Sequence, residues 1–182
     1  MSNHSAENAP SSPGRRNFLK LTAGTALVAG VSLAVAKLLG VGKLTMQQAD
    51  ELARSLPILR TELVKAKQEE KPYLEGQYRE AFDRLIRDGY SWIIIDLVQN
   101  NNLPNEGPLT RSLVQTAAVR FRQDVTIQGF EAEMVHGVSA AYRTNLRDAQ
   151  GIVAQIKAKA WEIASTIPKP SPSAINDSGF IP

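Results

Sequence analysis

The side chains best suited to chemistry in this sequence are two histidines and the carboxylates near one of them. His4 lies close to the N-terminus, and His136 follows Glu133 in the stretch Glu-Met-Val-His. A Glu-x-x-His stretch on a helix supplies two ligands of a carboxylate di-iron site, but that site needs the stretch twice and two more glutamates. One usable histidine leaves the set incomplete, so we predict no metal site.

The other residue types that catalysis needs are missing or isolated. The chain has no cysteine, which excludes thiolate zinc sites, iron–sulfur clusters and covalently attached haem. Serine and threonine hydroxyls have no recognisable histidine partner, and no glycine-rich loop follows a predicted strand. We therefore expect no catalytic residue, no bound cofactor and no enzyme activity. The alternative is a stand-alone exported enzyme with an unfamiliar site.

The charge balance argues against nucleic acid as a partner. The formal net charge is +3, from 21 basic and 18 acidic residues. Residues 1–36 hold Arg15, Arg16, Lys20 and Glu7, so 18 basic and 17 acidic residues remain after them. Nucleic-acid-binding domains gather positive charge on one face, and a nearly neutral remainder does not indicate such a face.

The N-terminal segment has the pattern of a twin-arginine export signal. Arg15 and Arg16 are followed by one spacer residue and by Phe18, Leu19 and Lys20, and a mildly apolar run then covers residues 21–36. A basic region before a short apolar run is typical of export signals, which are addresses and not parts of the fold. Because the twin-arginine route carries folded proteins, we expect the domain to fold before export.

We expect the signal to be residues 1–36, the folded domain 37–168 and a flexible tail 169–182. Ala34 and Ala36 fit the small-x-small pattern for cleavage, which predicts a mature start near Lys37. Sixteen helical residues reach about 24 Å, less than the roughly 30 Å hydrocarbon core of a bilayer. An uncleaved anchor extending through Leu39 is the alternative.

The remaining sequence predicts an all-α fold, an up-and-down antiparallel four-helix bundle with four or five helices. Thr45 and Gln48 form a capping-box pattern before a helix that we expect Pro57 to kink or split. Apolar residues recur at three- and four-residue steps over 49–66, 73–99, 109–125, 130–141 and 152–167, as on one face of a helix. The segments 109–125 and 130–141 are either one flawed helix or two.

Two groups of side chains are candidates for a binding surface. Tyr78, Tyr90 and Trp92 have helical spacing, which favours the core over an aromatic groove. An arginine band follows the loop 100–107. Its candidate docking residues are Arg111, Arg120 and Arg122, with Arg143 and Arg147 nearby. The alternative is a solvated face paired with Asp124 and Asp148.

Residues 82–167 resemble the PsbQ-like extrinsic subunits of photosystem II. Leu85-Ile86-Arg87-Asp88 leading to Trp92 is similar to a Leu-Ile-x-Asp segment before a tryptophan in the cyanobacterial members. Gly107-Pro108-Leu109 with Arg111 resembles their Gly-Pro-Leu followed by an arginine. The loop before Gly107 is longer than in the family, the segment from Gly107 to Phe130 is shorter, and the lipid-anchoring cysteine of the cyanobacterial members is missing.

The resemblance implies a non-catalytic subunit in the thylakoid lumen, peripheral to the membrane. Such an extrinsic protein docks on the photosystem II core and on other extrinsic subunits. It stabilises the oxygen-evolving complex in photosynthesis without ligating manganese and without a small-molecule substrate. The alternative is a small subunit that supplies the twin-arginine signal to an exported, periplasmic dehydrogenase complex.

Overall fold

The computed structural model describes residues 26–166 of the chain. All regular structure in this part is helical, as expected, and no strand occurs in it. The expected number of four or five helices is too low for the described residues. They form seven: α2 (Ala26–Leu39), α3 (Met46–Lys65), α4 (Lys71–Arg87), α5 (Ser91–Gln99), α6 (Pro108–Thr126), α7 (Phe130–Tyr142) and α8 (Leu146–Ser165).

The beginning of α3 confirms the predicted capping box. The Gln48 backbone N–H donates to Thr45 Oγ1 at 3.3 Å, and the Thr45 backbone N–H donates to Gln48 Oε1 at 2.9 Å. Both bonds use N–H groups that have no partner within the helix. Of the two effects predicted for Pro57, a kink or a split, the split is wrong, because α3 continues through the proline to Lys65. The inward face of α3 is buried on both sides of the proline, so packing holds the helix together across the missing hydrogen bond.

The expected single helix over 73–99 is two helices, α4 and α5. Gly89 separates them with a φ of +91°, a conformation that glycine adopts without strain. The Tyr90 N–H donates to Leu85 O at 2.7 Å and the Gly89 N–H to Ile86 O at 3.2 Å. These two bonds form a Schellman motif, which ends α4 and turns the chain into α5.

The segments 109–125 and 130–141 are also two helices, α6 and α7. Gly129, with a φ of +90°, is the residue immediately before α7. The last long helix, α8, begins earlier than its apolar pattern indicates, because Asn145 Oδ1 accepts the Asp148 N–H at 2.9 Å and caps it. The tail 169–182 lies outside the described residues.

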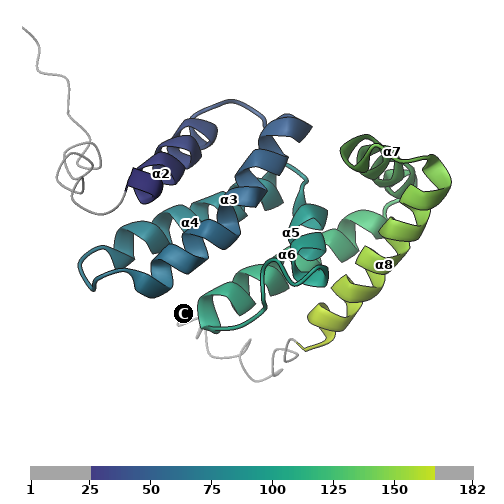
Figure 1. Cartoon of the computed structure of the whole chain (residues 1–182). Coiled ribbons are helices and arrows are strands. Elements are labelled where there is room, and N and C mark those ends of the chain that lie inside the picture. Colours follow the sequence, from purple (N-terminus) through teal and green to yellow (C-terminus); the bar gives the residue numbers. More distant parts are fainter. Residues whose placement is uncertain (1–25, 167–182) are drawn as a thin grey trace, which may run out of the picture.

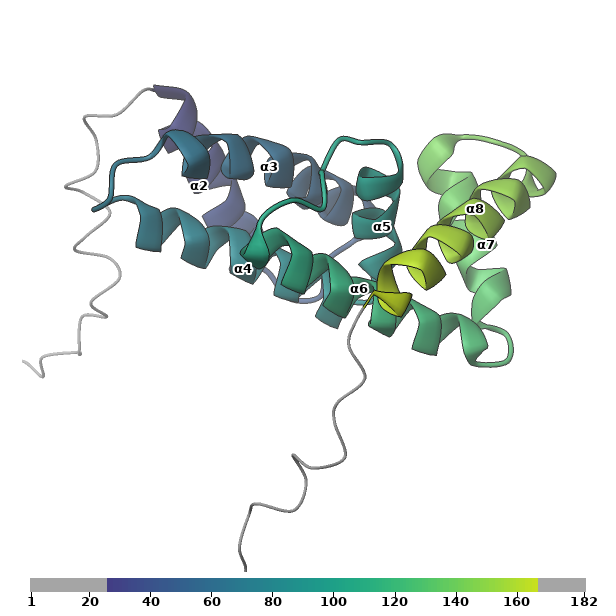
Figure 2. The ribbon, with the colours of Figure 1, turned by 90° about the horizontal axis from the view of Figure 1, so that it is seen from below.

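The helices form two groups, and α5 contacts helices of both. Helices α2, α3 and α4 pack against one another, and α6, α7 and α8 do the same. Figure 1 shows α5 and α6 between the first group and the α7–α8 pair. Figure 2, turned by 90°, shows α5 between α3 and the α7–α8 pair. Within the described residues α8 contacts neither α3 nor α4, so a simple closed four-helix bundle is not confirmed.

One apolar core continues through both groups. Its largest fully buried side chains include Tyr78 and Phe82 of α4, Ile94 of α5 and Phe121 of α6. Five consecutive residues of α5, Ser91–Ile95, are all buried. Five consecutive residues cover more than one full turn of a helix, so the first half of α5 is enclosed by the core on every side.

Candidate functional site

The three candidate docking arginines lie on two opposite edges of α6. Arg111 and Arg122 are eleven residues apart, about three helical turns, so they share one edge. Arg120 lies on the other edge, where its Nε is 3.2 Å from Asp124 Oδ1. The structure therefore brings Arg111 and Arg122 together on one side and separates Arg120 from them. The Arg120–Asp124 contact agrees with the pairing in the alternative, but Asp124 is buried and not solvated.

Arg122 lies against the aromatic ring of Trp161 on α8. Its Cζ is 3.5 Å from the ring centroid, and 48% of the Trp161 surface is exposed. A guanidinium over an indole face is a cation–π pair, which holds both side chains in place. Farther along the same edge, Gln115 Nε2 donates to Thr166 Oγ1 at 3.2 Å. These contacts define a surface between α6 and α8, which we call the Arg122–Trp161 surface.

Trp161 was not identified as a candidate from the sequence, although a signal for it existed. The apolar face of α8 includes Ile156, Ala160 and Ile163. A residue next to Ala160 is turned by about 100° around the helix axis, so a tryptophan at 161 lies off that face. A tryptophan in that position leaves apolar surface exposed to solvent, as the 48% exposure of Trp161 shows.

Asp124 is the most deeply buried carboxylate at this end of α6, with 5% of its surface exposed. Burial raises the pKa of its carboxyl group, and the charge of Arg120 acts in the opposite direction. Asp124 also lies in the last turn of α6, where the helix dipole disfavours a negative charge. The other predicted partner, Asp148, instead accepts from Asn145 Nδ2 at 2.7 Å at the start of α8.

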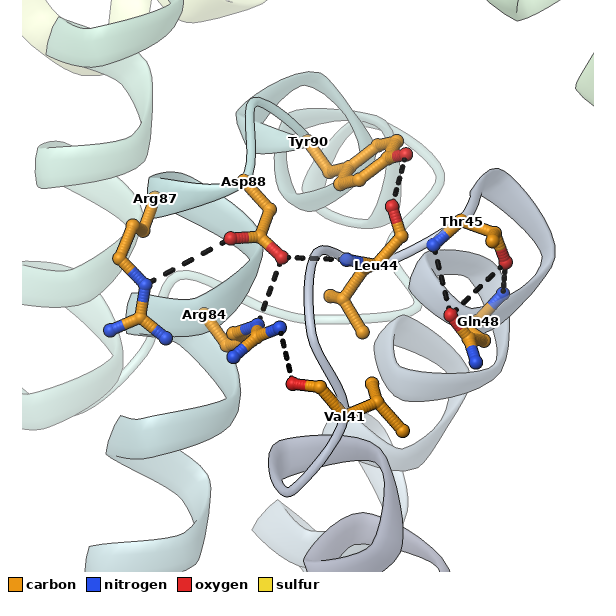
Figure 3. A network of polar contacts seen from close by, with 8 residues as sticks. All are labelled: Val41, Leu44, Thr45, Gln48, Arg84, Arg87, Asp88 and Tyr90. Atoms are coloured by element: carbon orange, nitrogen blue, oxygen red, sulfur yellow. Dashed lines mark hydrogen bonds and ion pairs between the residues drawn. The ribbon is translucent and has the colours of Figure 1, made fainter.

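A second polar group connects α4 to the segment between α2 and α3 (Figure 3). Asp88 Oδ2 accepts Arg84 Nε at 2.9 Å and the Leu44 backbone N–H at 2.9 Å. Arg84 Nη2 donates to Val41 O at 3.0 Å, and the Tyr90 hydroxyl donates to Leu44 O at 2.9 Å. The Arg84 and Asp88 side chains are each only 10% exposed. We call these five residues the Arg84–Asp88 cluster.

The Arg84–Asp88 cluster has the geometry of a structural clamp. Four hydrogen bonds join its members to one another, and three of the atoms that they use are backbone atoms of the 41–44 segment. Buried polar groups that satisfy one another fix one arrangement of the chain around them. The sequence offered a signal here too, since Arg84 and Asp88 are four residues apart on a helix and can pair.

The remaining sequence candidates lie apart from one another. Tyr78 and Trp92 are 1% and 4% exposed, which confirms that they belong to the core and not to a groove. The Tyr78 hydroxyl is 3.1 Å from Thr110 Oγ1, and burial raises its pKa. Glu133 and His136 of the Glu-x-x-His stretch are both exposed on α7. In the described part of the chain no three histidine, aspartate or glutamate side chains lie close enough to hold a metal ion.

The signal residues Arg15, Arg16, Phe18 and Leu19 lie outside the described residues. Among residues 26–166, no helix combines the length and apolar character needed to cross a bilayer. Comparison of the chain with protein-family models, with curated proteins and with solved structures finds no match.

Proposed function

We propose that this chain is a non-catalytic accessory subunit that docks on a membrane-bound complex after export by the twin-arginine route. The observation that carries the proposal is the Arg122–Trp161 surface. Tryptophan and arginine are the residue types most enriched among those that dominate binding energy at protein interfaces. Here the two are stacked at 3.5 Å while Trp161 remains about half exposed, so little side-chain freedom is lost when a partner covers them.

The proposed complex is photosystem II, on its lumenal side, with the subunit stabilising the oxygen-evolving complex. Support comes from the resemblance of residues 82–167 to the PsbQ-like subunits, because that stretch contains both Arg122 and Trp161. In this proposal the four long helices, α3, α4, α6 and α8, correspond to the four helices of the expected bundle, and α2, α5 and α7 are additions. The twin-arginine pattern at Arg15 and Arg16 supports delivery of a folded subunit to the lumen.

Fractionation followed by co-purification tests this proposal. The full chain, tagged at its C-terminus, is expected in the thylakoid lumen and in the fraction that contains the photosystem II core. Recovery from the periplasm with a flavin- or molybdenum-dependent dehydrogenase would replace photosystem II by the alternative complex. Recovery as a free protein from every fraction would contradict a docking role.

Substitutions at the Arg122–Trp161 surface test which face binds. Arg122→Glu and Trp161→Ala are each expected to weaken binding to the isolated complex about tenfold or more, as at other interface residues of these types. Arg79→Glu is the matched control, because Arg79 is an exposed arginine on α4, which makes no contact with α8. Equal binding by all three variants and the parent would exclude this surface.

A further inference from the structure

Helix α2 packs on α3 and α4 as an ordinary helix of the domain. Its contacts in the described chain are with these two helices, and it lies beside both in Figure 1. Val35 is fully buried and Leu38 is 7% exposed, whereas Leu33 is 55% exposed. One face of α2 is therefore covered by α3 and α4, and another is open to solvent.

Polar contacts attach the chain on both sides of the Ala36–Lys37 bond. Before it, Gln77 of α4, only 7% exposed, donates from Nε2 to the backbone oxygen of Ser32 at 3.2 Å. After it, the Arg84–Asp88 cluster binds backbone atoms of Val41 and Leu44. A buried amide group that reaches a backbone oxygen of α2 fixes the position of this helix along α4 more closely than apolar contact does.

The cleavage expected after Ala36 would therefore divide a packed helix. The Ala36–Lys37 bond lies inside α2. Ala36 and Lys37 are themselves exposed, but Val35 and Leu38 on either side of them are buried. Proteolysis of a folded protein occurs at exposed, weakly packed segments or after local opening. Cleavage at this bond would also remove Ser32 and Val35 and expose the faces of α3 and α4 that they cover.

We infer that α2 is retained in the exported protein, with the α3–α4 face as its binding surface and Val35, Leu38 and the Gln77–Ser32 bond as its contacts. In this inference the same segment belongs to the predicted export signal and remains as a helix of the folded domain. This inference goes beyond the proposed function and does not depend on which complex the protein joins. It predicts that the domain in use begins before Ser32.

The mass of the exported protein tests the inference directly. The full chain, with a C-terminal tag, is recovered from the exported fraction of a host that uses the twin-arginine route, and its intact mass is measured. The expected mass includes residues 32–36. A mass that lacks Ser32 overturns the inference, whatever the stability measurements show. If no protein is exported, the substitutions that follow decide the question.

Two substitutions in α2 provide a matched comparison in the full chain produced without export. Val35→Asp places a charge on the buried face, and Leu33→Asp places the same charge two residues away on the exposed face. We expect Val35→Asp to move the urea midpoint to lower denaturant, or to prevent folding, while Leu33→Asp leaves the midpoint near that of the parent. Equal midpoints overturn the inference. If neither variant folds, Val35→Ala and Leu33→Ala are compared by the same criterion.

Discussion

At the scale of single residues, the carboxylate of Asp88 joins two parts of the chain. It accepts a side-chain bond from Arg84 and a backbone bond from Leu44, 44 positions earlier in the sequence. The pair is nine-tenths buried, so removal of one partner leaves the other without compensation in a place that water barely reaches.

We predict that Asp88→Ala lowers the free energy of unfolding by about 2 to 4 kcal/mol, because it leaves the buried charge of Arg84 without an opposite charge and the Leu44 backbone N–H without an acceptor. Asp50→Ala is the control. It breaks an i,i+4 pair with Arg54 in which the side chains are 50% and 78% exposed, so its expected effect is below about 0.5 kcal/mol. Urea denaturation followed by circular dichroism measures both. Similar losses in the two variants would show that the Arg84–Asp88 cluster is not a clamp.

Asp124 gives a prediction on pH. Because its pKa is raised above the ordinary 3.8, the folded state holds this proton more tightly than the unfolded state does. Its contribution to stability is therefore full below pH 3.8 and is lost as the pH rises through the folded-state pKa. Urea midpoints of Asp124→Asn and the parent are measured between pH 3.5 and 7, in steps of about one pH unit. The difference between them should shift in favour of the variant as the pH increases.

The control for this experiment is Asp83→Asn, which removes one negative charge from an exposed site on α4. A midpoint difference between Asp124→Asn and the parent that stays constant with pH would contradict the prediction. That result would mean that the contact with Arg120, whose side chain is 54% exposed, offsets the effect of burial.

At the scale of helices, Pro57 is the least expected feature of α3. Proline has no N–H, so the carbonyl of Ala53, one turn earlier, loses its helical partner, at a cost of about 3 kcal/mol in a helix interior. Proline also lowers the conformational entropy of the unfolded chain, which stabilises the folded state by about 0.4 to 1 kcal/mol. Ala53 is 1% exposed, which leaves its carbonyl little access to water.

We therefore predict that Pro57→Ala stabilises the protein by about 2 to 2.5 kcal/mol. Thermal denaturation measures this as a higher midpoint temperature. Thr45→Ala, which removes the cap of the same helix, should act in the opposite direction by about 1 kcal/mol. A lower midpoint for Pro57→Ala would show that the proline packs in a way that alanine cannot replace.

The sequence predicts a helix boundary correctly where a few neighbouring residues determine it. The capping box at Thr45 needs only the four residues that form it, and it was predicted correctly. The boundary between α4 and α5 depends on Gly89. A glycine at this position is compatible both with a weak point inside one helix and with the left-handed residue that ends a helix. The apolar pattern continues through both helices, so periodicity alone could not show the break.

The candidate site was less predictable than the fold, because its contacts join distant residues. The sequence gives the spacing of Arg111, Arg120 and Arg122, but only the position of α8 shows that Arg122 meets Trp161. The packing of α2 was likewise hidden, since an apolar run after two arginines has the pattern of a signal. Nothing in that pattern identifies Val35 as buried and Leu33 as exposed.

At the scale of the whole molecule, α5 is the element that connects the two groups of helices. It contacts α3 and α4 of the first group and α6 and α8 of the second. Figure 2 shows α5 between α3 and the α7–α8 pair. Ile94 and Ile95 of α5 are fully buried. Because the core is continuous through α5, the two groups should unfold in one step.

The two tryptophans allow this cooperativity to be measured. Trp92 lies in α5 at 4% exposure, and Trp161 lies on α8 at 48%. In Trp161→Phe, fluorescence reports the environment of Trp92 alone, while circular dichroism reports all helices. We predict that the two urea transitions of this variant coincide, and that adding Ile94→Ala moves both by the same amount, equivalent to about 3 kcal/mol. If α2, α3 and α4 unfolded separately from α6, α7 and α8, the fluorescence and circular dichroism curves would separate, and Ile94→Ala would widen the gap between them.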